Sequence, residues 1–340
     1  MALQCYTKLI HLFKKIKSST SSSRCGLHDE RPLILRHFSH PSYLKISISD
    51  GNSINKECKI SGELPSFVSC CNGLALLTLS TPKRHIIFNP LKNENITTVY
   101  APYRGGEICG FFFHPHLKKY AILSVQSEYN GYGYGYGYDY NLYSLFESKN
   151  WRKIAGPYNF PWPLYRNPAI VNNALHWLTN DTITVFDIIT EEFSTRSLPI
   201  DKRECRIPRL LVKDEDRLCL CYVNCEEPVM DIWILEDYAE WSWVKKYSIN
   251  LDWDMSKYPV EESFDTRWEL MAKIKVISIH NNELVLYWKH RGVFYYHLEL
   301  NTLEKIDLRV SLIDKLTCND FNSLSDFEAY SAVKCDQCLV

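Results

Sequence analysis

The residues of this chain with the widest chemical repertoire are its 13 cysteines and 11 histidines. The groups whose spacing could serve a site are Cys70 and Cys71 in FVSCCNGLALL, Cys219, Cys221 and Cys225 in RLCLCYVNC, Cys335 and Cys338 in KCDQC, and His114 and His116 in FFFHPHLKKY. A zinc site needs a full set of convergent thiolate, imidazole or carboxylate ligands, and each group supplies only part of one. We therefore predict no metal and no cofactor.

Sequence signatures of catalysis are also missing. The chain contains no GxSxG elbow, no HExxH pair and no phosphate-binding P-loop. The stretch GYGYGYGYDY lacks the strand-to-helix context and the lysine that phosphate binding uses. We interpret it as a loop between two strands, either an incidental repeat expansion or a loop whose tyrosines contact a partner: Tyr132, Tyr134, Tyr136 and Tyr138. His176, beside Trp177, is interpreted as a strand histidine rather than a catalytic one.

Composition narrows the class of protein further. The 340 residues are 46% hydrophobic and 14% aromatic, which predicts an ordered core. A net charge of −1 argues against nucleic-acid binding by the whole protein. We find no apolar stretch long enough to span a membrane and no secretory signal, and therefore expect no membrane association. The odd cysteine count favours free thiols in a reducing compartment, the cytoplasm or the nucleus.

The elements that would position these residues are short strands. From about residue 33, β-type runs alternate with turn residues. Asn72-Gly73, Asn172-Asn173 and Asn281-Asn282 each separate two apolar runs, and LLVKDEDRLCLCYV has an acidic turn at the equivalent place. Because Asn and Gly tolerate the positive φ angles of tight hairpins, these places are predicted to be the same turn in successive copies of one unit.

A second pattern follows each of these turns. The segments at 88–96, 143–151, 185–193, 233–241 and 298–306 each begin and end on an apolar or aromatic residue with mostly polar residues between. A strand, a polar turn and a returning strand would produce this spacing. The copies start 55, 42, 48 and 65 residues apart, and a repeat of about 40 to 50 residues with several strands is typical of a propeller blade.

The repeat also explains the adjacent cysteines. Aligned on the turn, Cys70 corresponds to Ile170 and Ile279, and Cys71 to Val171 and His280. Adjacent strand residues point to opposite faces, so the two thiols do not converge easily on one ion. Both are predicted to be structural.

A family resemblance adds to these patterns. SCCNGLALL, IIFNPLKNE, GFFFHPHLKKYAILSV, YSLFESKNWRKI, VNNALHWL, VFDIITEEFSTRSLP and DIWILEDYAEWSWVKKYSI occur in that order. This series resembles the plant F-box-associated domain of F-box/kelch-like and S-locus F-box proteins, over roughly residues 28 to 310.

The resemblance implies an all-β, kelch-like β-propeller that captures a target protein for a ubiquitin ligase. We expect about six blades, with LILRHF and YLKISIS in the first and with closure by strands from both ends of the domain. Rim loops are the recognition surfaces of this family, so GPYNFPWPLYRNP is the segment best suited to contact a target. Its candidate contact residues are Tyr158, Phe160, Trp162, Tyr165 and Arg166. An alternative is that several of these aromatics cover the edge of the core.

The first residues differ from the rest of the chain. Residues 1–27 are interpreted as a basic amphipathic helix and a Ser-rich linker, residues 28–315 as the propeller, and residues 316–340 as a tail. CYTKLIHLFKKIKSST resembles only the tail of an F-box, so the residues present do not imply docking on a Skp-type adaptor and cullin. Two other functions stay open: a propeller enzyme acting on a sugar or other small molecule, and a propeller with a mitochondrial transit peptide.

Overall fold

Strands account for nearly all the regular structure in the described part of the chain. The computed structural model describes residues 6–12, 33–40, 43–49, 54–61, 66–72, 74–80, 83–89, 93–102, 106–129, 135–145, 150–157, 168–179, 182–200, 205–213, 217–224, 227–253, 255–257, 274–280, 282–288 and 291–305. One 3-10 helix, η2 (Met255–Lys257), accompanies 24 strands in these ranges. None of the described residues forms a helix long and apolar enough to cross a membrane.

The strands group in fours along the chain. The first three groups are β1 (Tyr6–Leu12), β2 (Leu33–His40), β3 (Tyr43–Ser49) and β4 (Ile54–Ser61); β5 (Ser66–Cys71), β6 (Leu74–Ser80), β7 (Lys83–Asn89) and β8 (Glu94–Tyr100); and β9 (Glu107–His114), β10 (Lys119–Tyr129), β11 (Gly135–Ser144) and β12 (Arg152–Ile154). The last three are β13 (Ala169–Val171), β14 (Ala174–Leu178), β15 (Thr182–Asp187) and β16 (Phe193–Ser197); β17 (Cys205–Lys213), β18 (Arg217–Asn224), β19 (Val229–Asp237) and β20 (Ser242–Asn250); and β21 (Ile274–His280), β22 (Glu283–Trp288), β23 (Gly292–His297) and β24 (Thr302–Lys305).

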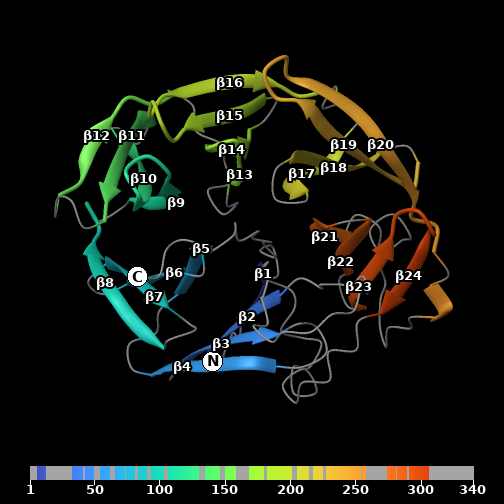
Figure 1. Ribbon diagram of the computed structural model, residues 1–340, viewed down its shortest axis with the longest axis horizontal. Helices are drawn as coiled ribbons and strands as arrows, with labels where there is room; N and C mark the ends of the chain where they lie inside the picture. The colour runs from blue at the N-terminus through green and yellow to red at the C-terminus, as the bar shows by residue number, and fades with distance from the viewer. Residues whose placement is uncertain are drawn as a thin grey trace, which may run out of the picture.

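Each group is an antiparallel meander, and the six groups form a ring. The first strand of each group lies toward the centre and the fourth at the circumference (Figure 1). The fifth and sixth groups are continuous through one parallel pair between β17 and β21, Lys213 with Ile279. The described chain is therefore a six-bladed β-propeller, which confirms the predicted fold class and blade count.

Two expectations about the N-terminal part of the chain are wrong. Residues Tyr6–Leu12 form strand β1, paired with β2 in continuous register from Tyr6–Ser39 to Leu12–Leu33, and not the predicted helix. Pairing with β2 satisfies the backbone groups on one side of this run, and that tertiary effect overrides its helical spacing. Each described blade is also built from four consecutive strands, so among the described residues no strand from one end of the chain completes a blade at the other. The predicted domain boundaries at 28 and 315, and the tail, lie outside the described residues.

The two sequence patterns correspond to two kinds of turn. Asn72, Asn172 and Asn173 adopt φ angles of 45°, 51° and 56° between the first and second strands of their blades. The apolar-to-apolar segments connect the third and fourth strands. Strands one and three run in the same direction, so both kinds of turn lie on one face of the ring, here called the turn face. The opposite face, called the linker face, carries the second-to-third turns and the connections between blades.

The core lies between blades, in layers formed by facing sheets. Three residues that end the apolar-to-apolar segments pack on the preceding blade: Trp151 on His85, Phe193 on Tyr140, and Trp241 on His176. Trp151 also packs beside Tyr143 of its own blade. The indole Nε1 of Trp151 donates to the Tyr100 carbonyl at 2.7 Å. Trp241 repeats this contact, donating to the Ser197 carbonyl at 2.8 Å. At Trp151, Phe193 and Trp241 the repeat seen in the sequence therefore joins a blade to the one before it.

Candidate functional site

The predicted partner contacts can be followed only in part. Seven of the nine candidate contact residues lie outside the described residues. They fall in two segments, 130–134 and 158–167. Tyr136 is in β11, but its side chain is outside the description. Tyr138 is partly buried and packs on the core between the third and fourth blades. Strands β10 and β12 both end at the linker face, so the two predicted contact segments leave the third blade at the same face. Their role stays a prediction.

The structure places a cavity on the other side of the ring, at the turn face. It has a volume of about 470 Å³ and is lined by residues of blades two to five. Volumes of about 300–1,000 Å³ are typical of ligand sites. Its walls come from the first-to-second turns of blades two, three and four, the β15–β16 turn, and the adjoining ends of β18 and β19.

Asparagines of the hairpin turns supply much of the polar lining. Asn72 comes from the second blade and Asn172 and Asn173 from the fourth. All three have positive φ angles, a conformation that Asn adopts more readily than most other residues with a side chain. This preference explains why asparagine occupies each of these turn positions. The Oδ1 atom of Asn72 is buried, and no donor among the described residues reaches it.

The apolar lining includes the two cysteines that begin the second hairpin. Cys70 and Cys71 are reduced cysteines, 4% and 8% exposed, and both line the cavity. Burial raises the pKa of Cys70, and the adjacent Cys71 raises it further. A thiol with a raised pKa is a poor nucleophile and metal ligand, so Cys70 acts as a small apolar side chain. Leu218 and Leu235 of the fifth blade extend the apolar surface.

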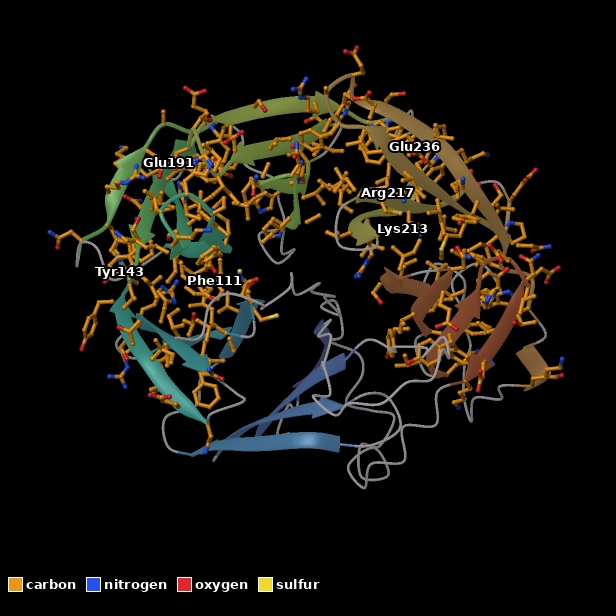
Figure 2. All side chains as sticks on the ribbon, viewed as in Figure 1. Phe111, Tyr143, Glu191, Lys213, Arg217 and Glu236 are labelled. Atoms are coloured by element: carbon orange, nitrogen blue, oxygen red, sulfur yellow. The ribbon has the colours of Figure 1, made fainter. Side chains whose placement is uncertain are left out.

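An ion pair and a tyrosine complete the cavity on the side of the fifth blade. Arg217 begins β18 and Glu236 lies near the end of β19; their Nη1 and Oε2 atoms are 3.9 Å apart. Figure 2 shows the two side chains on neighbouring strands, with Lys213 closer to the centre of the ring. Tyr238 follows β19 and also lines the cavity.

The hydroxyl of Tyr238 is hydrogen-bonded to a buried histidine of the fourth blade. The Nε2 atom of His176 is 2.9 Å from the Tyr238 hydroxyl, and its Nδ1 is 3.1 Å from the Ala169 carbonyl. A carbonyl only accepts, so Nδ1 carries the proton and Nε2 accepts from the tyrosine. Burial lowers the pKa of His176 to about 4, against a smaller opposing effect of backbone hydrogen bonds. The interpretation of His176 as a strand histidine agrees with this geometry.

The other cysteine and histidine groups show no ligand set. Cys219 and Cys221 share one face of β18 as predicted, are fully buried, and have Sγ atoms 3.8 Å apart in the core. The His114 Nδ1 atom accepts the Leu117 backbone N–H at 3.3 Å. Within the described ranges no three His, Cys, Asp or Glu side chains gather as a metal site. Cys225, Cys318, Cys335 and Cys338 lie outside those ranges.

Several cavity residues were not anticipated from the sequence. The turn asparagines were recognised as turn formers only, and Arg217, Glu236 and Tyr238 carried no motif. Their common signal is position, since each lies at or beside a turn of the same face. That signal can be read only once the blades are placed around a ring.

Comparison with known proteins agrees with this ring. The model of the F-box associated beta propeller domain matches residues 37–327. The chain belongs to this family. Its match covers most of the described strands, and the family's domain type agrees with the six blades of Figure 1. The resemblance read from the ordered motifs is therefore confirmed.

A relative and two solved structures are also similar. The F-box-associated chain is 27% identical over 142 residues to the Arabidopsis thaliana protein named "Putative F-box protein At1g53550", covering 40% of this chain and 33% of that protein. It thus spans about a third of the length of this curated relative. An oligogalacturonate lyase in complex with manganese has a TM-score of 0.50 at 8% identity, covering 89% of this chain and 78% of the other. A functionally unknown protein from Desulfotomaculum acetoxidans has a TM-score of 0.44 at 11% identity, with 82% of each chain covered.

These similarities carry different weight. At 8% identity the lyase shows a shared fold and nothing about activity. The family match and the Arabidopsis relative support a substrate-recognition module in general.

Proposed function

We propose that this chain is the target-recognition subunit of an SCF-type ubiquitin ligase. It would hold a target protein, while partner subunits carry out ubiquitin transfer. The observation that carries this proposal is the match of the F-box associated beta propeller domain to residues 37–327. A rigid ring of six blades suits this role, because it presents turns and linkers on two faces while its core stays packed.

We further propose that the chain has no catalytic activity of its own. Asp231, a buried carboxylate of the fifth blade, is held in structural contacts. The Asp231 carboxylate accepts from Tyr222 and Lys245, each at 3.1 Å, and from Ser248. Three donors from neighbouring strands thus hold this carboxylate in place within the fifth blade. Cys70 and Cys109 are thiols whose pKa is raised by burial.

Protein stability in cells provides the test. The full chain, tagged and expressed in plant cells, would be compared with an unrelated six-bladed propeller carrying the same tag. Proximity labelling would identify proteins near each bait, with and without a proteasome inhibitor. We expect proteins specific to this chain to accumulate when the proteasome is inhibited, and to be longer-lived in cells depleted of the chain.

Binding to the adaptor of the ligase is measured in a separate experiment. Purified chain would be mixed with a Skp-type adaptor and analysed by size-exclusion chromatography, because the residues present resemble only the tail of an F-box. Co-elution would show that this chain itself docks on the adaptor. Neighbours whose lifetimes are unchanged by depletion would refute a role in degradation.

A further inference from the structure

We propose that the cavity on the turn face binds a short, uncharged peptide segment that presents an apolar side chain. This inference rests on the proposed function as a protein-recognition module, and it names the part of a target that the ring would hold. The polar, apolar and charged parts of the lining each support the assignment.

The polar lining matches a peptide backbone. A carboxamide has an acceptor oxygen and a donor nitrogen, the same pair that a peptide group offers in reverse. Asn72, Asn172 and Asn173 bring three carboxamide-bearing residues to one cavity from two blades. The buried Oδ1 of Asn72 receives no hydrogen bond from the described residues. A peptide N–H is the donor it lacks, and a buried acceptor left unpaired is costly.

The apolar lining selects what the peptide carries. Leu218 and Leu235 of the fifth blade are 0% and 4% exposed. Cys70 and Cys71 of the second blade add to the same apolar lining. Burial keeps the Cys70 thiol uncharged, so this surface offers no charged partner. An aliphatic or aromatic side chain is the group that gains free energy on entering such a lining. A volume of about 470 Å³ accommodates one such side chain with its flanking backbone.

The charges of the lining compensate each other. Arg217 and Glu236 are the two ionisable lining residues of opposite sign, and they are paired at 3.9 Å. A charged ligand residue attracted by one of them would be repelled by the other. The cavity therefore has no net charge with which to select an acidic or basic segment, and binding should depend little on salt.

The walls are held in place before any ligand arrives. The turn asparagines have left-handed backbone angles set by their hairpins, and Tyr238 donates to His176 of the preceding blade. Groups held in this way lose little conformational entropy on binding, which favours specific recognition of a short segment.

Random linear peptides displayed on phage would be selected against the full chain. The enriched peptides would then be synthesised and titrated by fluorescence anisotropy. Asn72→Gly removes the carboxamide and tolerates the φ angle of 45°, so the turn is kept. Asn93→Gly is the matched control, with a φ of 55° at an exposed turn outside the cavity. We expect the first to weaken binding about tenfold and the second to change it less than about twofold.

Two further variants separate the site from the rest of the surface. Glu236→Trp places a large side chain at the cavity and should abolish binding. The double variant Arg217→Gln with Glu236→Gln removes both charges and should retain it. Binding by the unmodified chain should change less than about threefold between about 0.05 and 0.5 M NaCl.

Several results would overturn the proposal. These are selection that yields no binders, peptides that bind Glu236→Trp as well as the unmodified chain, and enriched peptides that are charged and lose binding in high salt. The outcome is independent of the test of the proposed function. If Asn72→Gly leaves the lifetimes of the cellular targets unchanged, the cavity assignment fails and the recognition function stands. If peptides bind the cavity but no target is degraded, the cavity assignment stands and the proposed function in degradation fails.

Discussion

Acid should loosen the ring at the contact between its fourth and fifth blades. His176 is buried and neutral there, and burial lowers its pKa from 6.5 to about 4. Protonation would turn its Nε2 from an acceptor into a donor facing the Tyr238 hydroxyl, 2.9 Å away. The hydrogen bond would then have to reverse inside a layer that also contains Trp241. His176 therefore binds a proton less readily in the folded state than in the unfolded chain.

The size and sign of the effect follow from the pKa difference. Above pH 6.5 the histidine is neutral in both states, and the free energy of unfolding is unaffected. Between pH 6.5 and about 4 the unfolded chain binds a proton that the folded chain does not, so stability falls as pH falls. The loss is about 2 kcal/mol between pH 7 and pH 5, and about 3 kcal/mol once both states are protonated.

Urea unfolding at pH 7 and pH 5 would measure this loss, with the His176→Asn variant as the comparison. Asn keeps a nitrogen donor near the position of Nδ1 but does not titrate. We expect the variant to lose about 2 kcal/mol less than the unmodified chain over this range. His85, between the second and third blades, is a second case, because burial lowers its pKa to about 4 as well. The two effects should add. An unchanged pH dependence in His176→Asn would refute the reasoning.

The remaining predictions concern packing within and between blades. Replacing Trp241 by Phe deletes the Nε1 donor to the Ser197 carbonyl and should lower the free energy of unfolding by about 1 kcal/mol, measured in urea; no change would show that this bond contributes nothing. A Cβ atom at Gly156 would overlap the ring of Tyr140, which is 1% exposed, so Gly156→Ala should cost about 1–3 kcal/mol, seen as a lower melting temperature. Cys109 should escape iodoacetamide in the native protein and react once unfolded, as read by peptide mass spectrometry, because burial raises its pKa; labelling of the native thiol would contradict its burial.

The local repeat was readable in the sequence because each blade is a local structure. Asn172 and Asn173 mark a tight turn through their own backbone preference, and the eight-residue spacing that ends at Trp151 or Trp241 reflects one short connection. Interactions between neighbours in sequence leave a pattern in the sequence. The ordered motifs for this reason predicted the six-bladed fold and the family.

The N-terminal strand and the cavity were not readable in this way. Tyr6–Leu12 has helical spacing, and only its pairing with Leu33–His40 decides that it is a strand. The cavity brings Asn72 to one site with Glu236, from blades two and five.

The sequence by itself thus determined the repeating unit, its turns and the structural role of Cys70 beside one of them, since these depend on residues close together along the chain. The tertiary structure decided which turns share a face, which polar atom is left without a partner, and where charges compensate. Those properties arise when distant segments close into a ring, and no interaction between sequence neighbours encodes them.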